Sequence, residues 1–461
     1  MYHFRFSVNS QVACPERLPD CVGRQGTEGP VLSLVEGPVL SGVEGLVTVF
    51  EYPVSDIRYP TSNYRPTGED FEKGEQMNQT NTSDRLEDLK VAIVHDWLSG
   101  MRGGEKVLEI LCELFPQADL FTLLHIPGSV SPAIEAPKIT TSFIDRLPFK
   151  KTKYRHYLPL FPTAIEQFDL KNYHLILSTS HCVAKGVITP PEALHISYLH
   201  TPMRYVWDMY HDYFGEDKIG WLSGKIIPLF ANYLRIWDVT SSNRVDWFLA
   251  NSQHVANRIG KFYRREATVI HPPVDTKHFS AARGNRGFDL VVSALVPYKR
   301  IDLAVSAYNR MKKKLVVVGE GPELGKLKNL AGSTIEFIDW QPPEKLVGYY
   351  RGCRMLIFPG EEDFGIVPVE AMACGKPVVA FAKGGALETV IGFTTAGDQP
   401  ATGIFFQKQQ VNDLISAVER AEQIEWDANF IAAHARKFDT SVFREKMLNF
   451  IREKTQLHFS K

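Results

Sequence analysis

The chain has 461 residues, more than one hydrophobic core usually supports, so its length predicts two domains. A net charge of -1 gives no general attraction to polynucleotides, and a nucleic-acid partner is therefore not favoured. The six cysteines form no CxxC pair and no zinc-ligand spacing, which indicates reduced core thiols and a cytoplasmic location. No apolar run reaches the roughly 18 to 20 residues that a membrane-spanning helix needs.

The beginning of the chain differs in composition from the rest. Residues 28–45 contain an octapeptide repeated nearly twice, and residues 61–88 have few apolar side chains to bury. We expect residues 1–86 to be a leader of low order, with Met77 as a candidate start of the native protein. A regulatory or docking extension is the alternative.

After the leader, predicted strands and helices alternate, which is typical of a parallel sheet with helices on both faces. Residues 90–95 predict an apolar strand and residues 103–115 an amphipathic helix. Gly103 and Gly104 begin this helix at the turn after the strand, where glycine lets the backbone approach a ligand closely. A plain tight turn is the alternative.

Further strands are predicted at residues 174–178, 193–199 and 247–250. His200 follows the second of these directly, and the carboxyl end of a strand in an α/β sheet faces the crevice where ligands bind. Residues 269–275 contain paired prolines and are interpreted as a hinge between the two domains.

Beyond the hinge, a strand is predicted at residues 288–293 and another at residues 314–318. The second is followed by Gly319 and Gly321, a pattern close to a dinucleotide-binding fingerprint. Leu324 stands where the fingerprint has its third small residue, so the match is incomplete. A nicotinamide-dependent dehydrogenase is therefore one alternative function.

The clearest chemical signal lies at residues 354–374, which predict a strand, a glycine-bearing loop and a helix. Glu362 lies in the loop and Glu370 on the helix. A helix N-terminus after such a loop presents N–H groups to an anion, and two carboxylates can accept hydrogen bonds from sugar hydroxyls. The pattern suggests recognition of a phosphorylated sugar. A glycoside hydrolase is the alternative, but a retaining one needs its two carboxyl groups about 5 Å apart.

Residues 361–373 resemble the Glu-x7-Glu motif of the retaining glycosyltransferases of family 4. Their amino-acid sequence is most similar to that of the O-antigen type mannosyltransferases. The resemblance implies an α/β chain of the GT-B fold, in which two Rossmann-like domains face a cleft. It implies an acceptor-side domain at 87–272, a nucleotide-sugar domain at 273–440, and a C-terminal helix at about 441–461 that packs back on the first domain.

The implied reaction moves a hexose from a nucleotide sugar to a hydroxyl with retained configuration. GDP-mannose is the first choice of donor, and a UDP- or ADP-sugar is the alternative. The implied acceptor is a glycan or a lipid-linked molecule in cell-surface polysaccharide synthesis. The nucleotide sugar is a co-substrate, and neither a further cofactor nor a metal is expected, because the chain has no Asp-x-Asp clamp. Cationic groups and helix N-termini must then neutralise the diphosphate.

The resemblance also implies roles for individual residues. His200 and Glu362 are implied to act at the donor sugar and the reaction centre, and Glu370 to hold the ribose. Lys299 matches a family lysine that grips the diphosphate, whereas Ala294 replaces the usual arginine. Arg300 either supplies the missing charge or is a surface residue. The remaining implied substrate-binding residues are Gly103, Gly104, Arg204, Gly321, Phe364, Gly365, Ile366 and Val367.

Residues 146–161 mix cationic and aromatic side chains, as segments at a membrane interface do. We expect the first domain to dock peripherally on the inner face of the membrane, beside a lipid-linked acceptor. A solvated basic loop is the alternative. The cationic residues concerned are Lys150, Lys151, Lys153 and Arg155.

Overall fold

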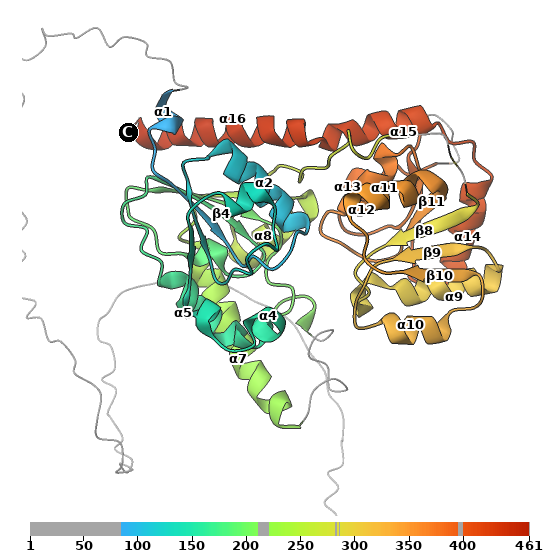
Figure 1. The fold of residues 1–461 in the computed structure, drawn as a ribbon, viewed down its shortest axis with the longest axis horizontal. Helices are drawn as coiled ribbons and strands as arrows, with labels where there is room; N and C mark the ends of the chain where they lie inside the picture. The colour runs from blue at the N-terminus through green and yellow to red at the C-terminus, as the bar shows by residue number, and fades with distance from the viewer. Residues whose placement is uncertain (1–83, 211–220, 282–283, 285, 395–399, 461) are drawn as a thin grey trace, which may run out of the picture. The chain divides into compact units, whose positions relative to one another are not determined.

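The computed structural model describes residues 84–210, 221–281, 284, 286–394 and 400–460 (Figure 1). The predicted leader at 1–86 lies outside the described residues except for its last three positions, and Met77 lies outside them as well. Only α1 (Asp84–Glu87) precedes the first strand of the described part.

The first of two parallel sheets has the strand order β3-β2-β1-β4-β5-β6-β7. Every pair in it is parallel, and the chain order reverses between β1 and β4. Ligands of open α/β sheets bind outside the carboxyl ends of the strands at such a reversal. The strands are β1 (Val91–His95), β2 (Asp119–Thr122), β3 (Ile139–Thr141), β4 (Leu175–Ser180), β5 (Leu194–Leu199), β6 (Trp247–Ala250) and β7 (Ala267–Val269).

The second sheet has the order β10-β9-β8-β11-β12-β13, again with parallel pairs only. Its own reversal lies between β8 and β11. The strands are β8 (Phe288–Val292), β9 (Leu315–Val318), β10 (Ile335–Ile338), β11 (Cys353–Phe358), β12 (Val378–Phe381) and β13 (Gly403–Phe406). The described chain therefore has the predicted architecture of two Rossmann-like sheets.

Helices cover both faces of the first sheet because its central strands are apolar on both sides. Along β1, Val91 and Ile93 belong to one core cluster, and Ala92 and Val94 belong to another. Helix α2 (Gly103–Leu114) packs into the first cluster, and α5 (Phe161–Glu166) and α7 (Trp221–Ser242) pack into the second.

The C-terminal helix α16 (Thr440–Phe459) also packs on the first sheet. Its apolar stripe is buried in the same core cluster as α2, and Figure 1 shows the two helices side by side. Asp439 caps this helix and pairs by a β-bridge with Val274 in the predicted hinge. The buried residues of the stripe are Phe443, Met447, Phe450 and Ile451.

The other helices lie between the strands in chain order. In the first half they are α3 (Pro132–Glu135), α4 (Lys150–Lys153) and α8 (Gln253–Tyr263). In the second half they are α9 (Ile301–Met311), α10 (Leu324–Leu330), α11 (Pro343–Gly352), α12 (Ile366–Ala373), α13 (Ala386–Thr389), α14 (Val411–Glu422) and α15 (Ala428–Ala435). Short 3-10 turns include η2 (Tyr154–Leu160), η3 (Ala184–Gly186) and η5 (Pro297–Lys299).

The predicted elements coincide with these bounds to within one or two residues. The largest difference is at β4, predicted at 174–178, which continues to Ser180. Its last three residues are small and polar but buried, so the apolar pattern ended before the strand did. None of the helices in the described part of the chain is long and apolar enough to cross a membrane.

Candidate functional site

The two glutamates of the predicted motif lie on either side of a sharp backbone turn. Gly365 caps α12 with φ 89°, a left-handed conformation that favours glycine. Glu362 precedes this turn, and its carbonyl oxygen accepts a hydrogen bond of 2.8 Å from the Gly385 N–H. Its carboxylate forms an ion pair with Lys299. The structure thus pairs Glu362, which was predicted to contact the donor sugar, with Lys299, which was predicted to bind the diphosphate of the same donor.

Glu370 lies one helical turn into α12 and is almost completely buried. Its Oε1 accepts a hydrogen bond of 3.1 Å from Lys106 Nζ, and its Oε2 accepts one of 2.8 Å from the Tyr350 hydroxyl. Burial next to this carboxylate raises the pKa of Tyr350 well above its ordinary value. Tyr350 therefore remains a hydrogen-bond donor that fixes the orientation of the carboxylate.

The first turn of α2 lies against both α12 and His200. A Cβ added at Gly103 would be 2.9 Å from Ile366 Cδ1, and one added at Gly104 would be 3.5 Å from His200 Nε2. Because Lys106 on the same helix reaches Glu370, the N-terminal turns of α2 and α12 converge. Backbone N–H groups at helix N-termini attract anions. The N-termini of α2 and α12 therefore lie close together.

His200 follows β5 and hydrogen-bonds through Nε2 to Thr179 Oγ1 at 2.7 Å. Burial lowers the pKa of His200 well below its ordinary value, and the neighbouring rings of His181 and His95 act in the same direction. The ring is therefore neutral near pH 7. A neutral imidazole can exchange hydrogen bonds with sugar hydroxyls without adding charge to the site.

Asp363 links the motif loop, residues 359–365 between β11 and α12, to the first sheet domain. Its Oδ1 lies 2.5 Å from Arg204 Nη2 and 3.1 Å from Arg258 Nη1. Burial alone would raise the pKa of Asp363, but the two guanidinium groups hold it below its usual range. For Arg204, burial would lower the pKa, and the Asp363 carboxylate raises it instead. Arg204 thus contacts the motif loop.

Lys299 and Arg300 point to different partners. A Cβ added at Gly360 would be 2.9 Å from the Lys299 Cα atom, so only glycine lets the motif loop approach η5 this closely. Arg300 instead pairs with Asp302 at 3.2 Å and contacts Gln409 Oε1 at 3.4 Å. The structure brings Lys299 to Glu362 but turns Arg300 toward its own helix.

The remaining predicted residues lie in or beside the motif loop. Phe364 is buried and stacks on His271 with ring centroids 5.4 Å apart, so its side chain belongs to the core. Ile366 and Val367 form the half-buried first turn of α12. A Cβ at Gly321 would come within 2.3 Å of the Leu295 carbonyl oxygen, which brings the Gly321 turn against the loop that leads to η5.

The cationic segment predicted to face a membrane lies on the protein surface. Lys150 pairs with Asp145 at 2.8 Å, whereas Lys151, Lys153 and Arg155 are exposed. Phe149, next to them, has 69% of its surface exposed.

Several residues of this region were missed by the sequence analysis. The helix that carries Lys106 was predicted only as a core helix, and the helices that carry Arg258 and Tyr350 were not predicted. No local motif marks any of these three residues. Asp363 lies within the predicted motif, residues 361–373, but no role was predicted for it. His181 follows β4 as His200 follows β5, so its position at a strand end was a signal that could have identified it.

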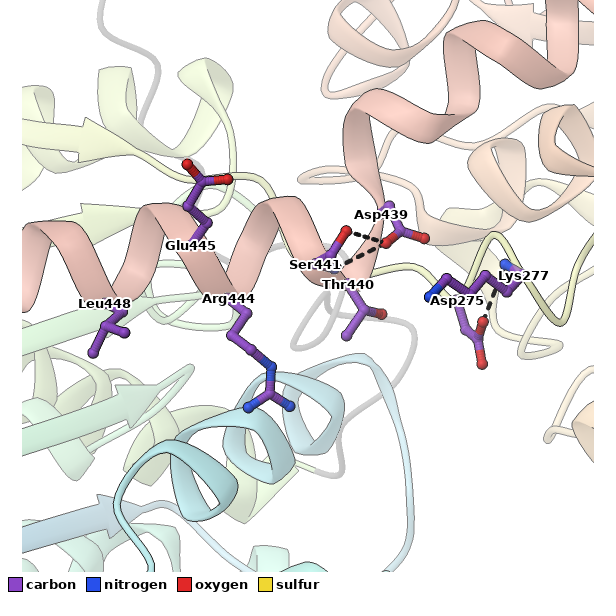
Figure 2. Close-up of a pocket in the computed structure, with 8 residues that line it drawn as sticks. All are labelled: Asp275, Lys277, Asp439, Thr440, Ser441, Arg444, Glu445 and Leu448. Carbon is purple, nitrogen blue, oxygen red and sulfur yellow. Dashed lines mark hydrogen bonds between the residues drawn. The ribbon is translucent and has the colours of Figure 1, made fainter.

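One solvent-open hollow lies elsewhere, where the hinge and the start of α16 meet (Figure 2). Its volume is about 500 Å³. Figure 2 shows Arg444 pointing toward α2, where it pairs with Glu113. None of the predicted site residues lines this hollow, so the converging helices remain the candidate site. The hollow is lined by Asp275, Lys277, Asp439, Thr440, Ser441, Arg444, Glu445 and Leu448.

Parts of the chain are similar in sequence to known glycosyltransferases. Residues 275–438 match the family described as "Glycosyl transferases group 1". An uncharacterized glycosyltransferase of Methanocaldococcus jannaschii is 29% identical over 189 residues, which cover 40% of this chain and 51% of that protein. The GDP-mannose-dependent alpha-(1-6)-phosphatidylinositol monomannoside mannosyltransferase of Mycolicibacterium smegmatis is 28% identical over 236 residues, 44% of this chain and 60% of that protein. The matches thus span about half the length of these relatives.

Solved structures extend the likeness to both sheets. HepE of Anabaena, crystallised with UDP and glucose, has a TM-score of 0.57 and 16% identity over 79% of this chain and 99% of its own. Sucrose-phosphate synthase of Thermosynechococcus elongatus has a TM-score of 0.57 and 17% identity over 79% of this chain and 98% of its own. At such identities the likeness establishes the fold. The described chain therefore has the GT-B fold, and its residues 275–438 match the group 1 glycosyl transferases.

Proposed function

We propose that this protein is a retaining glycosyltransferase that moves a hexose from a nucleoside diphosphate sugar to a hydroxyl group. The observation that carries the proposal is the convergence of the α2 and α12 N-terminal turns beside His200 and Glu370, with the Glu362–Lys299 ion pair in the loop that leads into α12. Helix N-termini and Lys299 would neutralise the diphosphate, and the two carboxylates would accept hydrogen bonds from sugar hydroxyls. The family match of residues 275–438 and the UDP complex of HepE support this proposal.

In this proposal the second domain holds the nucleotide and the first domain presents the acceptor. Glu370 would hold the ribose, and Glu362 would contact the donor sugar while Lys299 shifts to the diphosphate. The leaving phosphate oxygen would take the proton of the acceptor hydroxyl on the same face of the sugar. Stabilisation of the leaving diphosphate by fixed N–H groups is the main contribution expected from the protein.

GDP-mannose is the proposed donor and a glycan or lipid-linked hydroxyl the proposed acceptor, in cell-surface polysaccharide synthesis. The amino-acid sequence of the motif and the similarity to the mannosyltransferase of Mycolicibacterium smegmatis support this choice. A UDP- or ADP-sugar is the alternative donor, because HepE was crystallised with UDP-glucose and a plant starch synthase of the same fold with ADP.

Two other enzyme classes gain no specific support. A retaining glycoside hydrolase would use Glu362 and Glu370 as a cooperating pair, but each is held by a different lysine. A dehydrogenase would use the Gly321 turn for a dinucleotide, but Leu324 stands where the fingerprint has its third small residue.

We also propose peripheral contact with an anionic membrane through the first domain. The exposed cations of α4 and η2 support this, and so does an exposed apolar face on α7, where Leu229 and Ile236 are 72% and 61% exposed. The face repeats every three to four residues, as in interfacial helices. It comprises Ile226, Leu229, Phe230, Tyr233 and Ile236.

Vesicle sedimentation tests the membrane contact. The protein should sediment with phosphatidylglycerol vesicles and not with neutral phosphatidylcholine vesicles, and replacing Lys150, Lys151 and Lys153 by Gln should abolish the difference. Replacing Lys326 and Lys328, which are exposed on α10, is the matched control. Equal sedimentation with both vesicles would contradict the contact.

The transfer reaction is tested by incubating the protein with GDP-mannose, UDP-glucose or ADP-glucose and octyl α-mannoside. Nucleoside diphosphate release, with an α-linked product, is the expected result for one donor. Glu419→Gln is a matched control, since this glutamate is exposed on α14 far along the chain from the motif. Release of no diphosphate from any donor would contradict the proposed function.

A further inference from the structure

Asp96 is a completely buried carboxylate directly after β1. It accepts hydrogen bonds of 2.6 to 2.9 Å from four consecutive backbone N–H groups, those of residues 181–184. These bonds hold the backbone of the segment that follows β4. His181 is the first residue of that segment, so its position is set by Asp96 from the neighbouring strand.

The same carboxylate determines which ring nitrogen of His181 carries the proton. Nδ1 of His181 lies 3.0 Å from Asp96 Oδ2. A lone pair on Nδ1 would repel the carboxylate oxygen at this distance, so the proton is on Nδ1 and the lone pair is on Nε2. Burial lowers the pKa of His181 and outweighs the nearby Asp96, so the ring stays neutral.

Nε2 of His181 is left as an open hydrogen-bond acceptor. The side chain is 30% exposed, and none of the hydrogen bonds found among the described residues involves this atom. Trp97 holds the ring edge-on, with centroids 4.4 Å apart. A fixed, neutral and unpartnered imidazole nitrogen at a strand end is suited to bind a hydroxyl group.

His181 also lies beside the candidate site. Its ring centroid is 6.4 Å from that of His200 and 6.2 Å from that of His95, and these residues follow or end the adjacent strands β5 and β1. The strands β1 and β4 enclose the reversal point of the first sheet, where ligands of this fold class bind. The proposed nucleotide-binding residues belong mainly to the second sheet domain, so His181 is on the acceptor side.

We propose that His181 Nε2 accepts a hydrogen bond from a hydroxyl of the acceptor, and that Asp96 is the positioning residue that fixes its tautomer. This inference rests on the proposed transfer reaction and adds a residue that touches its second substrate. The ligand class is a polyhydroxylated acceptor, which presents several hydroxyl donors to such an atom.

The test compares His181→Ala and His181→Gln with Glu419→Gln, a control at an exposed residue on α14. The probes are the active nucleotide sugar, octyl α-mannoside as acceptor, and water as the alternative acceptor. Loss of one hydrogen bond should raise the KM for octyl α-mannoside about three- to tenfold in His181→Ala. Nucleoside diphosphate affinity and sugar transfer to water should not change. His181→Gln should recover part of the loss, because its amide can accept a hydrogen bond near the same position.

An unchanged acceptor KM in His181→Ala would overturn the inference while leaving the transfer reaction intact. Equal losses of acceptor KM, diphosphate affinity and transfer to water would also overturn it, because they would indicate a purely structural role. Absence of transfer by the wild-type protein would overturn the proposed function and this inference with it. Independently of activity, ¹⁵N NMR should show the Nδ1–H tautomer of His181, and the Nε2–H tautomer would contradict the inference.

Discussion

Lys106 Nζ lies 3.1 Å from Glu370 Oε1, which ties helix α2 of the first sheet domain to helix α12 of the second. The lysine side chain is 31% exposed and the glutamate side chain 6%. Solvent therefore screens one partner but hardly reaches the other. Such a pair should contribute more than an exposed ion pair and less than a fully buried one.

A double-mutant cycle measures this contact. Lys106→Met, Glu370→Gln and the double variant should give a coupling free energy of about 1 kcal/mol in urea unfolding. The matched control is the more exposed pair of Lys326 on α10 with Glu323, the residue that precedes this helix; their charged atoms are 3.1 Å apart, and the pair should give about 0 to 0.5 kcal/mol. Additive effects at Lys106 and Glu370 would contradict a direct contact between the two helices.

Asp363 should make stability depend on acid pH. Its pKa is lowered in the folded protein, so its contribution is fully present above the pKa of an unfolded aspartate, about 3.9. The contribution is lost as pH falls through the still lower folded-state pKa. Asp363→Asn should cost about 2 to 4 kcal/mol at pH 7, because two arginines lose their shared carboxylate.

Urea unfolding at pH 7 and at pH 3 and below provides the measurement for Asp363. The difference between the wild type and Asp363→Asn should shrink as the pH falls. Asp413→Asn is the control and should stay within about 0.5 kcal/mol of the wild type. A difference that is constant with pH would show that the carboxylate charge does not hold Arg204 and Arg258.

Alanine substitutions should distinguish a glycine that packs closely against backbone from a glycine with free space beside it. Gly321→Ala places a Cβ 2.3 Å from the Leu295 carbonyl oxygen and should destabilise the protein by several kcal/mol. Gly348→Ala on α11 meets nothing within 4 Å and should stabilise it by about 0.5 to 1 kcal/mol. Thermal unfolding checks both, and a tolerated Gly321→Ala would show that the turn is free to move.

The fold was largely predictable from the sequence because its signals are local. Strands such as β1 and β6 are short apolar runs, and α12 has a glycine before it and another just after it. Two such α/β halves and a family-like motif were enough to predict two Rossmann-like sheets. The polar end of β4 was missed because burial of serine and threonine depends on neighbouring strands rather than on local pattern.

The partners within the candidate site were not predictable. Lys106 and Glu370 are 264 positions apart, and Arg258 and Asp363 are 105 positions apart. No local periodicity encodes which distant charges meet. The same reason applies to Arg300, which was predicted either to supply the missing charge or to be a surface residue: its ion pair with Asp302 was not predicted.

The two glutamates should differ in what they bind. If Glu370 holds the ribose, Glu370→Gln weakens a charge-assisted hydrogen bond of roughly 1.5 to 3 kcal/mol and should reduce nucleoside diphosphate affinity by about tenfold or more. If Glu362 contacts the donor sugar, Glu362→Gln should spare diphosphate affinity and lower turnover, because its hydrogen bonds matter most in the transition state. Glu419→Gln, which is exposed on α14, should change neither.

Calorimetric titration of GDP and UDP into the wild type and these three variants measures directly whether Glu370 binds the nucleotide. We expect that the wild type binds one of the two nucleotides, that Glu370→Gln loses most of this affinity, and that Glu362→Gln and Glu419→Gln keep it. Undiminished affinity in Glu370→Gln, or equal loss in Glu362→Gln, would contradict the assigned roles, and no binding of either nucleotide by the wild type would contradict a GDP- or UDP-sugar site.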